Sequence, residues 1–226
     1  MSVIAHRDIR VHDTRDAAVD AVCELIWEAA PRTLVLTGGS TAGDAYRLLA
    51  EPENRDRVDW GLVELLFGDE RRVPPDSRDS NYRLAAETLL RGVRPGRVER
   101  MLGEAADPDA EALRYAGLIP DQLDVTLLGM GEDGHCASLF PGEPVLDESE
   151  RLVVPSRAHY EPYERYTMTF PALNRSKLVL FLVLGATKAE ALGAIVRGED
   201  LPSARVQPTD GHVIWIVDRA AAAGLP

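Results

Sequence analysis

The chain has 226 residues, of which 45% are apolar, and this size and composition are typical of one α/β domain with a substantial core. Its formal net charge of −12 argues against non-specific binding to nucleic acid or to an anionic membrane, because clustered Lys and Arg supply that affinity. No signal-peptide pattern begins the chain, and its longest apolar run, 178–186, is too short to span a bilayer. We therefore expect a cytoplasmic protein without a nucleic-acid or membrane partner.

The basic residues and the cysteines indicate which side chains could bind an anion and whether metal ligands or disulfides are expected. Of the 25 basic residues, only Lys177 and Lys188 are Lys, so a Lys near a ligand-binding loop is noteworthy. Cys23 and Cys136 show neither metal-ligand spacing nor a disulfide framework, which favours a reducing compartment.

Short apolar strands alternate with amphipathic helices along the chain. Helices are recognised by apolar residues at 3.6-residue spacing, and buried strands by short, continuous β-branched runs. In chain order, we expect helix 13–30, strand 33–37, helix 42–49, strand 63–67, helix 81–91, helix 109–118, strand 124–128, strand 165–170, strand 178–184, helix 187–196, strand 213–217 and a short Ala-rich helix.

This alternation predicts an α/β fold of the Rossmann type, with a single-domain, doubly wound, mostly parallel sheet flanked by helices. No linker-like segment interrupts the pattern, so one domain is expected over 1–226. Ligands bind such sheets beyond the carboxyl ends of the strands. The loops that follow the strands are therefore the candidate site.

The first of these loops is Thr37-Gly38-Gly39-Ser40-Thr41. Gly38 and Gly39 would let the backbone approach a ligand, and the hydroxyls of Ser40 and Thr41 stand where a helix begins. Free N–H groups and the positive end of the helix dipole make that place an anion site. A tight turn with an ordinary Ser/Thr N-cap explains the same residues equally well.

The second loop, 68–74, contains Asp69, Glu70, Arg71 and Arg72 directly after a strand. Two carboxylates and two guanidiniums there could move protons and bind phosphate, whereas a solvated charge run is the alternative. The position at the ligand edge of the sheet makes the two interpretations about even. Downstream, 79–81 is typical of a helix cap, from which Asn81 could reach the site.

The third loop, Gly129-Met130-Gly131-Glu132-Asp133-Gly134-His135, carries the strongest signal. Its three glycines indicate a tightly contoured backbone, and Asp133 stands close enough in sequence to orient the imidazole of His135. Histidine is the usual general acid and base near neutral pH. A dinucleotide-binding GxGxxG interpretation is weak, because no regular helix is indicated after the loop.

The fourth loop is Gly185-Ala186-Thr187-Lys188. Lys188 falls in the first turn of an expected helix, where a cation opposes the helix dipole. A solvated lysine would lose at most about 1 kcal/mol there, but we favour phosphate binding because Lys is so scarce in this chain.

Together these segments resemble the 6-phosphogluconolactonase family, in the family's order and over nearly the whole chain. The matching segments are Gly38-Gly39-Ser40-Thr41, Asp69-Glu70-Arg71 with Val73-Pro74, Ser80-Asn81, 129–135 continued by 137–142, the Arg165 strand, Gly185 with Lys188, and Trp215 with Asp218. The glucosamine-6-phosphate deaminases are the nearest relatives by fold, but their histidine is followed by an Asn-Glu-Pro stretch where this chain has 138–141, Ser-Leu-Phe-Pro. They also have Tyr where this chain has Arg71.

Two residues depart from the family pattern. Ala42 replaces Pro, which removes a preorganised first helical turn. Cys136 replaces Thr, and an exposed thiolate there would make the site sensitive to oxidation.

The resemblance implies hydrolysis of 6-phospho-D-glucono-1,5-lactone to 6-phospho-D-gluconate, with no cofactor and no metal. It implies His135 as general base and then acid, oriented by Asp133, with Arg71 stabilising the oxyanion or holding phosphate. The residues expected to bind the substrate and its phosphate are Gly38, Gly39, Ser40, Thr41, Asp69, Asn81, Gly131, Arg165 and Lys188.

Three other functions use the same residues. A deaminase or isomerase would use the site for proton transfer, and a sugar-phosphate sensor would bind without turnover. A serine hydrolase is disfavoured, because the chain has no Gly-x-Ser-x-Gly elbow. We expect a monomer, with a dimer as the alternative.

Overall fold

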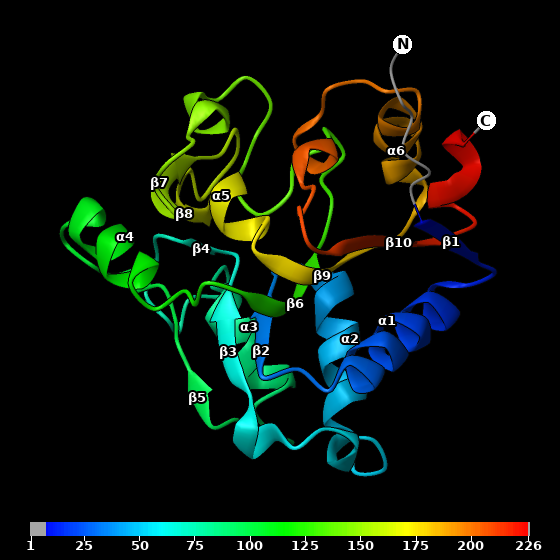
Figure 1. Cartoon of the computed structure of the whole chain (residues 1–226), viewed down its shortest axis with the longest axis horizontal. Coiled ribbons are helices and arrows are strands. Elements are labelled where there is room, and N and C mark those ends of the chain that lie inside the picture. The colour runs from blue at the N-terminus through cyan, green and yellow to red at the C-terminus, as the bar shows by residue number, and fades with distance from the viewer. Residues whose placement is uncertain (1–7, 226) are drawn as a thin grey trace.

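The structure, a computed structural model, describes residues 8–225. Its main feature is a seven-stranded sheet with the order β1-β10-β9-β6-β2-β3-β5, in which every neighbouring pair is parallel (Figure 1). The strands are β1 Asp8–His12, β2 Thr33–Leu36, β3 Glu64–Phe67, β5 Arg97–Val98, β6 Leu123–Leu128, β9 Ser176–Val183 and β10 His212–Asp218.

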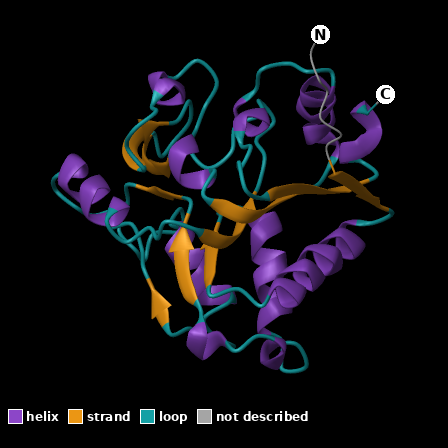
Figure 2. Ribbon diagram, in the orientation of Figure 1, coloured by secondary structure: helices purple, strands orange, loops and turns teal. Residues whose placement is uncertain are grey.

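Helices cover both faces of this sheet (Figure 2). The helices are α1 Arg15–Ala29, α2 Ser40–Ala50, α3 Asn81–Thr88, α4 Pro108–Ala116, α5 Phe170–Leu173 and α6 Ala189–Val196. Short 3-10 turns lie at Arg55–Arg57, Trp60–Leu62, Pro144–Asp147, Ala186–Lys188, Pro202–Arg205 and Ala221–Gly224.

Two buried clusters hold these layers together, and successive residues of a strand alternate between them. In β2, Leu34 and Leu36 belong to the cluster that includes residues of α1, α2 and α3, whereas Val35 belongs to the cluster that includes residues of α4, α5 and α6. A strand that is buried on both faces must be apolar at every position, which is why β2 reads as a continuous apolar run. The predicted α/β fold with a mostly parallel sheet is confirmed, and the single domain over 1–226 stays a prediction.

A second sheet of three antiparallel strands packs beside the first, in the order β4-β8-β7. It consists of β4 Asp69–Arg71, β7 Val153–Arg157 and β8 Glu164–Met168. The sequence predicted 68–74 as a loop, and this was wrong for 69–71. Three charged residues carry little intrinsic strand preference, and the strand exists because it pairs with β8, almost a hundred residues later.

The order of the strands also places the ligand crevice. After β2 the chain adds β3 and β5 on one side, and it then returns to place β6 on the other side of β2. This reversal between β2 and β6 is the switch point at which open α/β sheets bind ligands. The loops after β2 and β6 are the first and third of the candidate loops.

Candidate active site

A cavity of about 210 Å³ opens at the carboxyl ends of the parallel strands, and all four candidate loops contribute to it. Nine of the twelve predicted site residues line it, namely Gly38, Gly39, Asp69, Arg71, Asn81, Gly131, His135, Arg165 and Lys188. The other three, Ser40, Thr41 and Asp133, do not form its wall.

The Asp133–His135 pair follows β6. The carboxylate Oδ1 of Asp133 lies 2.5 Å from Nδ1 of His135 and also accepts the His135 backbone N–H at 3.2 Å. Burial raises the pKa of Asp133, but the hydrogen bond and the charge of His135 outweigh it and hold that pKa below its usual value. With Nδ1 bound to a carboxylate, the His135 tautomer that leaves Nε2 free to accept a proton is favoured.

Gly131 is required by this pair rather than by its own backbone angle. A Cβ at position 131 would lie 2.0 Å from Nδ1 of His135 and 2.5 Å from Oδ1 of Asp133. The backbone of Gly131 also donates its N–H to the His135 carbonyl at 2.8 Å. The loop therefore wraps tightly around the imidazole, and only glycine leaves room for it.

We expect Gly131→Ala to lower kcat at least about 100-fold, because the added methyl group must displace the two side chains that it meets, and a shift of 1 Å can cost that much. Steady-state kinetics would measure the change. Gly117→Ala at the end of α4 is the control, since its Cβ would meet only ordinary contacts at 3.4 Å or more. Normal turnover by the Gly131 variant would contradict this role.

Asp69 and Asn81 form the floor of the cavity. Asp69 is buried, and its two carboxylate oxygens accept hydrogen bonds from Nδ2 of Asn81 at 3.0 Å and from Oγ of Ser138 at 2.7 Å. Gly38 passes so close to Asn81 that a Cβ there would lie 2.0 Å from Oδ1 of Asn81. The hydroxyl of Ser138 donates to Asp69 rather than to His135, so Ser138 and His135 do not form the nucleophile–base pair of a serine hydrolase.

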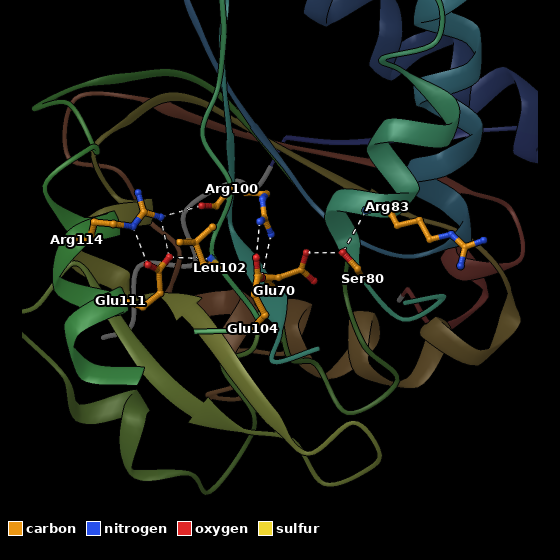
Figure 3. A network of polar contacts seen from close by, with 8 residues as sticks. All are labelled: Glu70, Ser80, Arg83, Arg100, Leu102, Glu104, Glu111 and Arg114. Carbon is orange, nitrogen blue, oxygen red and sulfur yellow. Dashed lines mark hydrogen bonds and ion pairs between the residues drawn. The ribbon is translucent and has the colours of Figure 1, made fainter. Parts of the chain in front are cut away.

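Glu70 fastens β4 to the start of α3. Its carboxylate accepts the backbone N–H groups of Arg71, Asn81 and Tyr82, at 2.7, 2.7 and 2.8 Å. It also accepts the Ser80 hydroxyl at 2.9 Å, a contact drawn in Figure 3. The same hydroxyl accepts the N–H of Arg83 and is the N-cap of α3, as the sequence predicted for 79–81. Asn81 is thereby fixed against Asp69.

The segment after β5 supports β4 from the outer side. Glu111 on α4 accepts the Leu102 N–H at 2.7 Å and holds Arg114, as Figure 3 shows. Gly103 in this segment packs so tightly that a Cβ would lie 2.4 Å from the carbonyl oxygens of both Arg71 and Val73. The backbone of Arg71 is therefore enclosed between α3 and this segment.

Arg71 and Arg165 face each other in the second sheet, as directly opposed residues of β4 and β8. The guanidinium of Arg71 donates to the Asp79 carbonyl, and Nε of Arg165 donates to the Pro162 carbonyl at 2.7 Å. Burial, together with the nearby charge of Arg71, lowers the pKa of Arg165. Two like charges opposed across a sheet repel each other, and a bound anion removes that cost.

The remaining positive groups lie at the ends of β2 and β9. Lys188 closes the 3-10 turn Ala186–Lys188 just before α6, and it has no ion-pair partner among residues 8–225. The N-cap of α2 is Gly39 at φ 95° with no side-chain hydrogen bond, so the Ser/Thr N-cap interpretation was wrong. Ser40 and Thr41 form the first turn of α2, where Thr41 accepts a hydrogen bond from Arg15 at 3.5 Å.

Four aromatic or polar residues of the cavity lining were missed as site residues: Thr37, Ser138, Phe140 and Tyr160. The ring centroid of Phe140 lies 4.3 Å from that of His135. Phe140 and Ser138 follow His135 closely and belong to the motif already noted, so their place could have been inferred. Tyr160 is on the loop between β7 and β8, where no sequence motif indicated a functional residue.

Cys136 does not have the exposure that oxidation would require. It is 1% exposed, and burial raises the pKa of its thiol to about 12. The thiol is therefore protonated at neutral pH and shielded from solvent, and Cys136 is not a reactive site.

Three further features of residues 8–225 bear on function, namely a second hollow, the arrangement of metal-ligating residue types and the character of the helices. A larger hollow of about 660 Å³ lies between the turn Pro144–Asp147 and β7, and three of the five carboxylates that line it, Glu143, Glu148 and Glu164, are paired with basic side chains. No group of three His, Cys, Asp or Glu within residues 8–225 is arranged to hold a metal ion. Over the same residues, no helix has the length and apolar character needed to cross a membrane.

Comparison with known proteins identifies the family. A family model described as glucosamine-6-phosphate isomerases/6-phosphogluconolactonase matches residues 7–215. The chain belongs to this family. A 6-phosphogluconolactonase from Synechocystis is 34% identical over 242 residues, covering all of this chain and 98% of that protein. One from Mycobacterium tuberculosis is 34% identical over 244 residues with the same coverage.

Solved structures show the same relationship within the glucosamine-6-phosphate isomerase/6-phosphogluconolactonase family. The 6-phosphogluconolactonase from Thermotoga maritima is 31% identical and superposes with a TM-score of 0.83, covering 94% of this chain and all of that one. A monomeric glucosamine-6-phosphate deaminase superposes with a TM-score of 0.84 at 22% identity, covering 96% of this chain and 99% of that one, and it shares the fold. The predicted family and fold are confirmed.

Proposed function

We propose that this enzyme hydrolyses 6-phospho-D-glucono-1,5-lactone to 6-phospho-D-gluconate, the lactonase step of the oxidative pentose phosphate pathway. The observation that carries the proposal is the Asp133–His135 pair in the same cavity as Arg71, Arg165 and Lys188. A proton-transfer group beside several cations suits an ester that carries a phosphate. The relatives named 6-phosphogluconolactonase support the same activity.

In this mechanism, His135 is the proton carrier. Its Nε2 accepts a proton from a water molecule as the water oxygen attacks C1 of the lactone. The C1 carbonyl oxygen becomes an oxyanion, and the tetrahedral intermediate then expels the ring oxygen, which takes the proton from His135. The bond between C1 and the ring oxygen breaks, and the acid that forms is ionised at neutral pH. Asp133 stabilises the imidazolium between the two steps.

The positive groups divide between oxyanion and phosphate. We assign the oxyanion to Arg71, and the phosphate to Arg165, Lys188 and the free N–H groups at the start of α2, where Gly39, Ser40 and Thr41 lie. Gly38, Gly131, Asp69 and Asn81 shape the floor on which the sugar rests. A lactone is an activated ester, so this scheme needs neither a metal nor a covalent nucleophile.

A pH-stat assay with freshly made phospholactone, corrected for spontaneous hydrolysis, tests the proposal. We expect acid release that depends on the enzyme, and much slower turnover of a lactone without the phosphate. Ammonia release from glucosamine 6-phosphate would instead support a deaminase. Thermal stabilisation by the sugar phosphate without turnover would support a sensor.

The substitution Lys188→Ala is expected to raise KM about tenfold or more and to change kcat little, because it removes binding to a phosphate that does not react. Lys177→Ala is a matched control. Lys177 is the only other lysine, it pairs with Asp124 at 2.7 Å, and it lies near the opposite, amino end of β9. An unchanged KM for the Lys188 variant would exclude it as a main phosphate ligand.

We also propose that the enzyme works as a cytoplasmic monomer and needs no nucleic acid or membrane partner. Sedimentation at micromolar concentration would distinguish the monomer from a dimer.

A further inference from the structure

Tyr160, to which the mechanism above gives no role, forms part of the cavity wall from the loop between β7 and β8. Its ring centroid lies 5.4 Å from the guanidinium carbon of Arg165. The ring also stands edge-on to Phe140 at 5.8 Å and lies 6.4 Å from the ring of His135. One side chain therefore adjoins both the cationic and the proton-transfer groups of the site.

Arg165 is a buried cation that an aromatic neighbour can stabilise. It is 1% exposed, its Nη2 has no hydrogen-bond partner among residues 8–225, and Arg71 opposes it across the sheet. A buried and incompletely paired cation is costly, and an aromatic face lowers that cost without neutralising the charge. The ring of Tyr160 therefore holds the guanidinium in place while leaving it positive.

Part of the Tyr160 side chain is also exposed and could contact a ligand. It remains 49% exposed although it lines the cavity. Burial raises the pKa of its phenol, so the side chain is neutral at physiological pH and faces Arg165 as an uncharged ring. Within the described part of the chain, the Tyr160 hydroxyl has no hydrogen-bond partner. We therefore assign the contact with Arg165 to the ring and not to the hydroxyl.

We propose that Tyr160 is a substrate-positioning residue, whose ring fixes the Arg165 guanidinium for an anionic group and is covered by the bound phosphosugar. This proposal rests on the lactonase function proposed above. Tyr160 acts on binding rather than on proton transfer, because the Asp133–His135 pair is held independently by its own loop.

Two variants of Tyr160 test the proposal in the lactonase assay. Tyr160→Leu keeps apolar bulk but lacks the aromatic face, and we expect it to raise KM roughly 5- to 30-fold, the scale of a desolvated cation–π contact, with kcat little changed. Tyr160→Phe should behave like the unmodified protein. An unchanged KM in the Leu variant, or an equal loss in the Phe variant, would overturn the proposal.

Tyr163→Leu is the matched control. Tyr163 is on the same loop, and its ring lies over Arg157 at 5.3 Å, but it does not line the cavity. We expect its KM to be unchanged. If it matched the Tyr160→Leu variant, the effect would come from loosening of the hairpin, and the proposed role would be wrong.

Calorimetric binding of 6-phosphogluconate separates this proposal from the proposed function. We expect the Leu variant at 160 to weaken binding by the same factor as it raises KM. If the protein binds 6-phosphogluconate but does not hydrolyse the lactone, the lactonase function is refuted. The role of Tyr160 would still be decided by comparing the dissociation constant of the unmodified protein with that of the Tyr160→Leu variant. Equal affinities would refute that role.

Discussion

Replacing His135 with alanine is expected to lower kcat for lactone hydrolysis about 10²- to 10⁴-fold, because the variant has no group to take a proton from the attacking water or to give one to the ring oxygen. KM should change much less, since the cationic side chains that hold the substrate remain. The measurement is steady-state hydrolysis of phospholactone, together with thermal unfolding to establish that the variant is folded.

His159→Ala provides the control for this experiment. His159 pairs with Glu143 at 3.0 Å, and the centroid of its ring lies 5.5 Å from that of Phe140. It does not line the cavity. We expect normal turnover from it. Near-normal turnover by the His135 variant itself would show that the proton carrier has been wrongly assigned.

The second large effect is expected at Glu70 and concerns stability. Glu70 is 3% exposed and accepts four hydrogen bonds, three of them from backbone N–H groups. Replacing it with alanine leaves buried donors without partners, and we expect the free energy of unfolding to fall by about 3 kcal/mol or more. For a chain of this size that corresponds to a fall in Tm of roughly 6–12 °C, measured by calorimetry.

Glu87→Gln is the matched control. Glu87 is on the same helix, α3, but its partner is the side chain of Arg83, at 2.8 Å on the exposed surface. Such a pair is worth about 0.5 kcal/mol or less, so Tm should scarcely change. If the Glu70 variant were as stable as this control, the link between β4 and α3 would be unimportant for folding.

The sequence was most informative where a signal is local. The apolar run of β2 shows that the strand is buried on both faces, and the parallel-sheet rule then places the loops after β2, β3, β6 and β9 at one edge. The Asp133–His135 pair spans only two residues, so its chemistry could be inferred without a fold. Four separate loops could thus be assigned to one candidate site from the sequence.

The two edge strands of the main sheet were not predicted, and neither was the break in the expected helix 187–196, for equally physical reasons. β1 and β5 are short strands at the two edges of the sheet, so neither shows the apolar run of a central strand. The expected helix 187–196 is divided into a 3-10 turn and α6, which places Lys188 at their junction rather than inside a regular helix.

What the sequence determined by itself is the parallel α/β sheet, the edge at which the candidate site lies and the acid–histidine pair. The tertiary structure alone decided that Asp69–Arg71 is a strand, that Arg71 opposes Arg165, and that Tyr160 stands over Arg165. The first two contacts join segments almost a hundred residues apart, and the third joins two residues of the β7–β8 hairpin. Their energy comes from pairing and burial that exist only after the second sheet has formed, so no local pattern of residues could reveal them.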